Sequence, residues 1–132
     1  MDASAFIEYL IATPLSSGLR THIEEAEELH TPALCDIEVV SVFRRLVRER
    51  RLGAQQAHYV LDGYVDLPLW RHPHVGMIGR ILELRDRFSA YDAAYVVLAE
   101  RLRAPLLTLD RRLARAIGEA RIAVELVRSG AS

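Results

Sequence analysis

Residues 89–115, SAYDAAYVVLAERLRAPLLTLDRRLAR, predict a helix, a short buried strand and the start of another helix. Ser89 is a favoured N-cap residue, and apolar side chains then recur at helical spacing to about Arg103. Those side chains are Ala93, Ala94, Val97, Leu98 and Leu102. Pro105 stops the helix, and the run Leu106, Leu107, Leu109 is typical of a parallel strand covered on both faces.

This stretch carries two acids at its turning points. Asp92 falls in the first turn of the predicted helix, and Asp110 comes just after the strand. In an open α/β sheet, the carboxyl ends of strands and the adjoining helix starts share one edge, where such folds usually build their sites. We therefore expect both acids to face the same crevice.

Length and composition predict one compact domain, residues 1–132. With 132 residues, 51% of them hydrophobic, the chain has ample core material. No apolar run approaches the roughly 20 residues of a membrane span, and the start, with Asp2 and Glu8, lacks the basic region of a signal peptide. A single cysteine, Cys35, makes no internal disulfide and gives no zinc spacing. We expect a cytoplasmic protein that does not enter a membrane.

Helical and extended patterns alternate along the rest of the chain, which favours an α/β fold with a mainly parallel sheet. Helices are expected at residues 3–11, 16–28, 36–52, 54–64, 75–87 and 111–118, and short strands at 30–34, 65–70 and 123–127. For the helix at 36–52, Asp36 is the N-cap candidate and Gly53 the stop. Its inward residues are expected to be Ile37, Val40, Phe43, Leu46 and Val47.

Four acids occupy comparable places, each at or near a helix start: Asp2, Glu38, Asp92 and Asp110. Taken singly, each is explained by helix capping, because free amides and the helix dipole favour carboxylates there. Taken together on one sheet edge, they repel unless one is protonated or cations neutralise them. Hard oxygen ligands suit Mg²⁺ or Mn²⁺. Such a site activates water for phosphoryl chemistry, and therefore indicates a metal-dependent nuclease without a Ser, Cys or His nucleophile.

The basic residues are unevenly distributed, although the net charge is only −1. All 17 are Arg, and two clusters contain Arg44 with Arg45 and Arg111 with Arg112. Guanidinium groups suit phosphates, so these four arginines are candidates for RNA binding. The alternative is that they are solvated helix faces.

Four segments together resemble the PIN-domain family, in particular the VapC toxins of bacterial toxin–antitoxin pairs. They are DASA (2–5), Glu38 with Val39 and Val40, AYDAAY (90–95) with Leu98 and Ala99, and LTLD (107–110). The resemblance covers nearly the whole chain. The AYDAAY and LTLD segments, in this order and at this separation, are its most specific part.

The resemblance implies a PIN-like three-layer α/β/α sandwich and a Mg²⁺- or Mn²⁺-dependent endoribonuclease that leaves a 5′-phosphate and a 3′-hydroxyl. It also implies a cognate VapB-type antitoxin and a homodimer. Asp2, Glu38, Asp92 and Asp110 match the family's acidic quartet, with Asp2 and Asp92 as the main metal ligands. Ser4 and Thr108 match the hydroxyl positions that support the quartet.

One departure concerns the N-terminus. Members of the family usually carry an apolar strand before the first Asp, whereas only Met1 precedes Asp2. We expect this strand to be missing or truncated, and the hypothesis for its absence is a translation start that lies upstream of Met1.

Two other functions stay open on the sequence alone. A catalytically inactive PIN-like protein would act only by binding a partner, and an RNA-maturation nuclease would work without an antitoxin. Weaker motifs do not compete with these. His72-x-His74 is interrupted by Pro73 and is expected to be loop polarity, and Gly76-x-x-Gly79 lacks the rest of a dinucleotide fingerprint. Tyr91 and Tyr95, four residues apart, suit either base stacking or a core or dimer contact.

Overall fold

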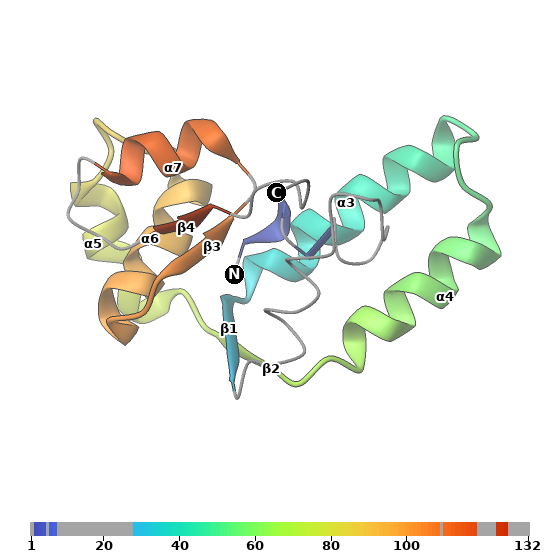
Figure 1. Cartoon of the computed structure of the whole chain (residues 1–132), viewed down its shortest axis with the longest axis horizontal. Helices are drawn as coiled ribbons and strands as arrows, with labels where there is room; N and C mark the ends of the chain where they lie inside the picture. The colour runs from blue at the N-terminus through green and yellow to red at the C-terminus, as the bar shows by residue number, and fades with distance from the viewer. Residues whose placement is uncertain (1, 5, 8–27, 109, 119–123, 127–132) are drawn as a thin grey trace, which may run out of the picture.

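The computed structural model describes residues 2–4, 6–7, 28–108, 110–118 and 124–126. Within them, short strands alternate with helices along the chain (Figure 1). In chain order the elements are β1 (Leu29–Pro32), α3 (Leu34–Arg48), α4 (Ala54–Val65), β2 (Leu69–His72), the 3₁₀ turn η2 (Val75–Met77), α5 (Ile78–Glu83), α6 (Ala90–Leu102), β3 (Leu106–Thr108), α7 (Arg111–Gly118) and β4 (Val124–Leu126).

The strands pair in parallel, as the sequence predicted. β1 pairs with β2, with Leu29 opposite Leu69, and β3 pairs with β4, with Leu106 opposite Val124. Helix α6 packs against both β1 and β3, so it joins the two strand pairs, while α7 packs on β3 and β4 (Figure 1). The expected α/β class with parallel pairing is therefore confirmed.

Helix α6 is the centre of the core and follows the sequence prediction closely. All side chains from residue 93 to residue 99 are buried. The Asp92 amide donates to Ser89 Oγ over 3.1 Å, so Ser89 is the N-cap. At the other end Arg103 adopts a left-handed conformation with φ 51°, which ends the helix before Pro105.

Helix α3 differs from its prediction at both ends. It begins at Leu34, so Asp36 lies inside its first turn and the predicted capping role of Asp36 is wrong. The Leu34 amide instead donates to His74 Nε2 over 2.9 Å. The helix ends at Arg48, and Gly53 is the N-cap of α4 rather than the stop of α3.

The buried face of α3 agrees with the prediction at Phe43, and Leu46 and Val47 are partly buried against the core, but the first half of the helix differs. Cys35, Val39 and Phe43 are buried, whereas Ile37 is 72% exposed. Both sets recur at helical spacing, so the apolar pattern alone did not choose between the two faces. The buried side chains Cys35, Val39 and Phe43 belong to the same core cluster as the buried residues of α6, so tertiary packing decides which face is covered.

Boundaries of other elements also differ from the prediction. The strand predicted at residues 65–70 lies at Leu69–His72, because Val65 still belongs to α4 and Pro68 precedes the strand. The helix predicted at 75–87 is η2 followed by α5, and it ends at Glu83. The predicted helix at 16–28 lies outside the described residues except for Glu28, which is not helical. Of the helix predicted at 3–11, the described residues 3, 4, 6 and 7 are helical.

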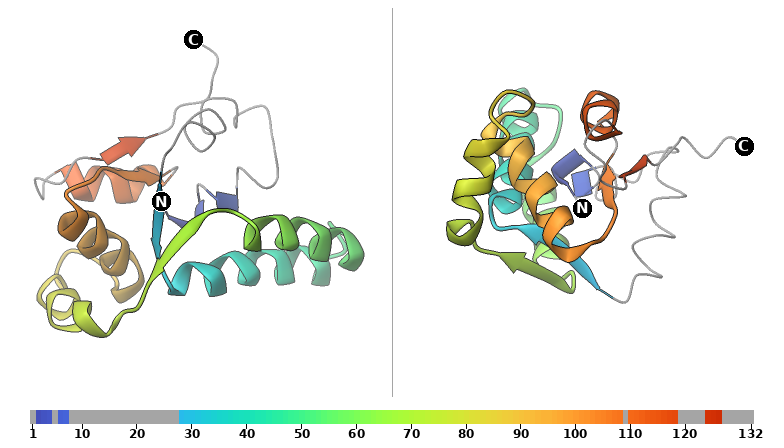
Figure 2. Two further views of the ribbon diagram at one scale, coloured as in Figure 1. Left: turned by 90° about the horizontal axis from the view of Figure 1, so that it is seen from below. Right: turned by 90° about the vertical axis from the view of Figure 1, so that its left-hand side faces the viewer.

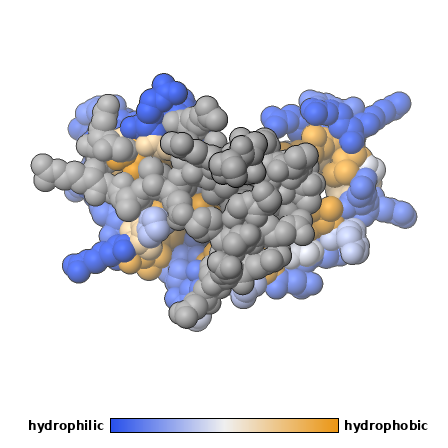
Figure 3. Space-filling view, in the orientation of Figure 1, coloured by the Kyte–Doolittle hydropathy of each residue, from blue (hydrophilic) through white to orange (hydrophobic). Residues whose placement is uncertain are grey.

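Helices α3 and α4 lie side by side and project from the rest of the described structure (Figure 1). An apolar groove runs between them, lined by Val40, Phe43, Val47, Ala57 and Leu61. The space-filling view shows hydrophobic surface on this side of the molecule, edged by hydrophilic residues (Figure 3). Among the described residues, no helix is both long and apolar enough to cross a bilayer.

A second, narrow groove of about 130 Å³ lies between β1 and β3. Leu98, Ala99 and Leu102 of α6 contribute to its lining. The Asp2 amide donates to the Leu107 carbonyl over 3.1 Å, so the N-terminal residues, blue in Figure 2, lie beside β3. That the apolar strand before Asp2 is missing or truncated stays a prediction.

Candidate active site

Asp2 is held by two hydroxyl groups at the end of β3. Its carboxylate is buried, although Asp2 directly precedes the N-terminal helical residues. Ser4 Oγ donates to Asp2 Oδ1 over 2.6 Å, and Thr108 Oγ1 donates to Asp2 Oδ2. The structure therefore places both hydroxyls expected to support the acids directly on Asp2.

Thr108 also connects Asp2 to Asp110. Its hydroxyl oxygen accepts a hydrogen bond from the Asp110 amide over 3.0 Å. Asp110 Oδ1 in turn accepts from the amides of Arg112 (3.0 Å) and Leu113 (3.1 Å), and so caps the start of α7. Capping thus accounts for one carboxylate oxygen of Asp110, whereas Oδ2 is directed toward Arg112.

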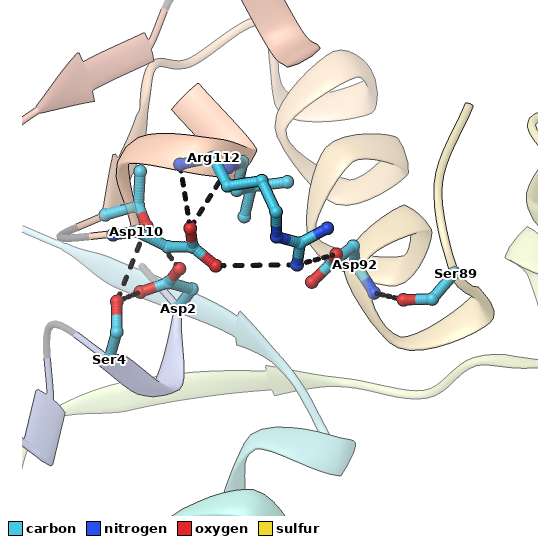
Figure 4. A network of polar contacts seen from close by, with 8 residues as sticks. Asp2, Ser4, Ser89, Asp92, Asp110 and Arg112 are labelled. Atoms are coloured by element: carbon cyan, nitrogen blue, oxygen red, sulfur yellow. Dashed lines mark hydrogen bonds and ion pairs between the residues drawn. The ribbon is translucent and has the colours of Figure 1, made fainter. Parts of the chain in front are cut away.

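Asp92 and Asp110 share a cation. Arg112 Nη2 lies 3.3 Å from Asp92 Oδ2 and 3.7 Å from Asp110 Oδ2 (Figure 4). The two acids come from the first turn of α6 and from the loop before α7, which are far apart in sequence. The two carboxylates therefore lie close together, as the parallel strands predicted, and both face the positive charge of Arg112.

Glu38 approaches the crevice from α3. Because α3 begins two residues earlier than predicted, Glu38 lies one residue beyond its first turn. Its Oε1 accepts a hydrogen bond from the Tyr95 hydroxyl over 2.9 Å. Burial raises the pKa of the Glu38 carboxyl above its ordinary value, the Tyr95 hydrogen bond opposes this, and the negative charges of Asp2 and Asp92 add to the rise.

Tyr95 was not recognised as part of the site from sequence. The structure buries it in the core, where its hydroxyl orients Glu38. Burial also raises the pKa of Tyr95, so it remains a hydrogen-bond donor at neutral pH. The available signal was its spacing of three residues from Asp92 on α6, which places both side chains toward the same side of the helix. Tyr91, by contrast, is exposed.

The four acids are neighbours but do not form one complete ligand shell. No three His, Cys, Asp or Glu side chains among the described residues are close enough to hold a single ion. The pair that shares a cation position is Asp92 with Asp110, whereas Asp2 and Asp92 were expected to be the main ligands. Mg²⁺ commonly binds through one or two carboxylates and keeps several waters. A shared position between two carboxylates, with further acids nearby, fits such an ion.

The four arginines proposed for RNA binding lie in different places. Arg112 reaches the acids, and α7 contains Arg111, whose side chain lies outside what the structure describes. Arg45 is exposed and follows Glu38 by seven residues, so it lies two turns along α3 on the same side. Arg44 lines the apolar groove between α3 and α4.

The histidine motif has structural contacts. His72 Nε2 lies 2.9 Å from His30 Nδ1, and His74 Nε2 accepts the first amide hydrogen of α3. These contacts hold β1, β2 and the start of α3 together. The role is structural, but the expected loop position is wrong for His72, which lies at the end of β2.

Comparison with known proteins gives consistent results. A family model described as "PIN domain" matches residues 1–119. Ribonuclease VapC9 of Mycobacterium tuberculosis is 43% identical over 113 residues, which cover 86% of each chain. Ribonuclease VapC12 of the same species is 34% identical over 89% of this chain and 91% of its own length. Ribonuclease VapC1, also from that species, is 35% identical over 89% and 90%.

Proposed function

Because the chain belongs to the PIN domain family, we propose that it is an endoribonuclease that acts as the toxin of a VapBC-type toxin–antitoxin pair and depends on Mg²⁺ or Mn²⁺. The membership confirms the resemblance and the PIN-like α/β/α class expected from the sequence. The substrate is RNA, and the partner that inhibits the toxin is a VapB-type antitoxin. The functional unit is a cytoplasmic homodimer.

The observation that carries this proposal is the position shared by Asp92 and Asp110. Two carboxylates from separate elements approach one positive charge at distances of 3.3 and 3.7 Å. A third acid, Glu38, has a raised pKa partly because Asp2 and Asp92 are near it. Negative charge concentrated in this way is stable only with cations, and its oxygen donors suit Mg²⁺ or Mn²⁺.

The residues have separate roles in the proposed reaction. Asp92 and Asp2 would hold the ion, Asp110 beside Asp92 would complete its oxygen donors, and Ser4 and Thr108 fix the Asp2 carboxylate. A bound Mg²⁺ or Mn²⁺ would polarise the scissile phosphate and lower the pKa of the attacking water. Glu38, oriented by Tyr95, would accept a hydrogen bond from the attacking water and take up its proton, a role that its raised pKa favours. As the water oxygen bonds to phosphorus, the bond to the 3′ oxygen breaks, and that oxygen would take a proton from solvent.

Arginines hold the RNA backbone around this centre. Arg112 lies at the acids, and Arg45 lies on the Glu38 side of α3, so the two flank a path across the crevice. Arg111 is adjacent to Arg112. Arg44 lines the α3–α4 groove and also, with Arg45, a second hollow on α3, so it would add general attraction for the backbone. Guanidinium groups bind phosphate oxygens in a bidentate geometry that suits this task.

The test is RNA cleavage by the purified chain with and without Mg²⁺ or Mn²⁺. Asp92→Asn keeps the size of the side chain but removes its charge, and should lower the rate by roughly 100-fold or more. Asp62→Asn is the matched control, since Asp62 is an exposed acid on α4. Cleavage that resists a chelator, or full activity in a folded Asp92→Asn protein, would contradict the proposal.

The same experiment separates the alternatives. An inactive PIN-like binding protein would take up no metal in the crevice and cut no RNA. An RNA-maturation nuclease would pass the cleavage test but would not be inhibited by the product of a neighbouring reading frame. Inhibition by that product supports the toxin assignment.

A further inference from the structure

We propose that Arg112 is an internal substitute for the divalent ion: it bridges Asp92 and Asp110 when no metal is bound and leaves that position when metal binds. The proposal rests on the proposed function, because it concerns the same crevice. It means that a positive charge of the chain itself competes with the metal for this position. The affinity of the crevice for metal is therefore lower than it would be without Arg112.

The geometry shows where the competition occurs. A single guanidinium nitrogen, Nη2 of Arg112, approaches Oδ2 of both acids (Figure 4). Asp92, with Asp110 beside it, would also help to hold a divalent ion, so the ion and the guanidinium would compete for the same carboxylates. A guanidinium and a divalent cation repel each other at such a distance, so the two states exclude one another.

The two acids are partly buried, whereas the arginine is exposed to solvent. The side chains of Asp92 and Asp110 are 22% and 35% exposed, but that of Arg112 is 79% exposed. Ion pairs of an exposed arginine are weak, because water screens them and the long side chain loses freedom. Arg112 can therefore neutralise the empty crevice without closing it to metal.

The backbone of Arg112 remains fixed while its side chain changes place. Its amide donates to Asp110 Oδ1 over 3.0 Å, at the capped start of α7. When the guanidinium group moves away from the two acids, it therefore stays at the edge of the crevice. There it meets the phosphate next to the bond to be cut, in the bidentate geometry that arginine favours. One residue thus serves the empty crevice and the substrate-bound crevice in turn.

The first experiment measures metal binding without RNA. Isothermal titration with Mn²⁺ compares the unmodified chain, Arg112→Ala and Arg115→Ala. Arg115 is the matched control, since it is exposed on the same helix one turn further from the capped end and makes no recorded contact with either acid in the described residues. We expect Arg112→Ala to bind Mn²⁺ about two- to fivefold more tightly, the range for loss of an exposed ion pair, and Arg115→Ala to change the dissociation constant by less.

The outcomes separate this inference from the proposed function. Binding by the unmodified chain with equal or weaker binding by Arg112→Ala overturns the role of Arg112 alone. Absence of Mn²⁺ binding by every variant, confirmed folded by circular dichroism, overturns the proposed function and this inference with it. An equal gain in Arg115→Ala would show a general charge effect and would also overturn the inference.

A second experiment tests the released state. RNA binding is compared for Glu38→Gln, used to suppress cleavage, and for the double variant with Arg112→Ala. We expect Arg112→Ala to weaken RNA binding severalfold in the presence of Mn²⁺ and to have a smaller effect in its absence, when the guanidinium is engaged by Asp92 and Asp110. An effect independent of Mn²⁺ would contradict the exchange between two positions.

Discussion

Two acids that lie two residues apart on α3 have opposite surroundings. Asp36 accepts a hydrogen bond from the Tyr64 hydroxyl over 2.6 Å, and Arg71 Nε lies 2.8 and 3.0 Å from its two oxygens. Glu38 also accepts a hydrogen bond from a buried tyrosine, Tyr95, but its charged neighbours are Asp2 and Asp92. Asp36 is neutralised within the chain, whereas Glu38 is surrounded by like charge.

The difference distinguishes a structural acid from a functional one. Arg71 also lies over the Tyr64 ring, so Asp36, Tyr64 and Arg71 form a complete cluster that fastens α3 to α4 and β2. No positive side chain of the described residues pairs with Glu38, which is typical of a site that binds a ligand. The comparison therefore predicts that equivalent substitutions at the two acids have opposite consequences.

The largest expected difference is in activity. Glu38→Gln removes the proton acceptor and should lower the rate of RNA cleavage by about 100-fold. Asp36→Asn makes the same chemical change on the same helix and should leave the rate within about threefold, because its partners do not touch the crevice. Initial rates at saturating metal measure both. Comparable losses in the two variants would remove the distinction between the acids.

The next effect is on stability, and it falls on Asp36. Asp36→Asn removes the charged partner that Arg71 has in the described structure and weakens one of the hydrogen bonds to Tyr64 or Arg71. The expected loss is about 1 kcal/mol, or roughly 4 °C in Tm. Thermal unfolding without metal gives the value. An unchanged Tm would mean that the cluster contributes no net stability.

Glu38→Gln should change stability in the opposite direction. A carboxyl whose pKa is raised by folding stabilises the protein while it is protonated, and this contribution is lost as the pH rises through the raised pKa. At neutral pH without metal, the charged Glu38 therefore costs stability, and the Gln variant should melt about 2 °C higher. The advantage should disappear at acidic pH, where Glu38 is protonated. A lower Tm for Glu38→Gln at neutral pH would contradict the crowding of charge.

Much of this arrangement could be predicted from the sequence, because the relevant residues lie next to residues that start or stop a helix. Ser89 and Pro105 bound α6, and the short apolar run places Asp110 after β3. Parallel pairing then brings Asp92 and Asp110 to one edge, which composition and periodicity were sufficient to predict. Family resemblance added Ser4 and Thr108, whose contacts with Asp2 join the start of the chain to β3.

The parts that the sequence missed depend on tertiary contacts. The start of α3 is set by His74, forty residues further along the chain, and the role of Asp36 is set by Arg71 and Tyr64. Periodicity could not choose the buried face of α3, because Ile37 and Val39 each belong to a helical repeat. The position of Arg112 between the acids likewise requires α6 and α7 to be placed relative to each other.

The smallest expected effect compares the two tyrosines. Tyr95→Phe removes the hydrogen bond that opposes the rise in the pKa of Glu38, so this pKa should increase further and the acidic limb of the pH–rate profile should move up by about 0.5 pH unit. Tyr64→Phe removes the corresponding bond to Asp36 and should leave that limb in place. Both variants lose one buried hydroxyl, and each should lose about 1 kcal/mol of stability. If both variants lose similar stability but only Tyr95→Phe shifts its pH–rate profile, Tyr95 sets the pKa of Glu38 in addition to supporting the fold. A shift in the profiles of both variants would instead assign the effect to general loosening of α3.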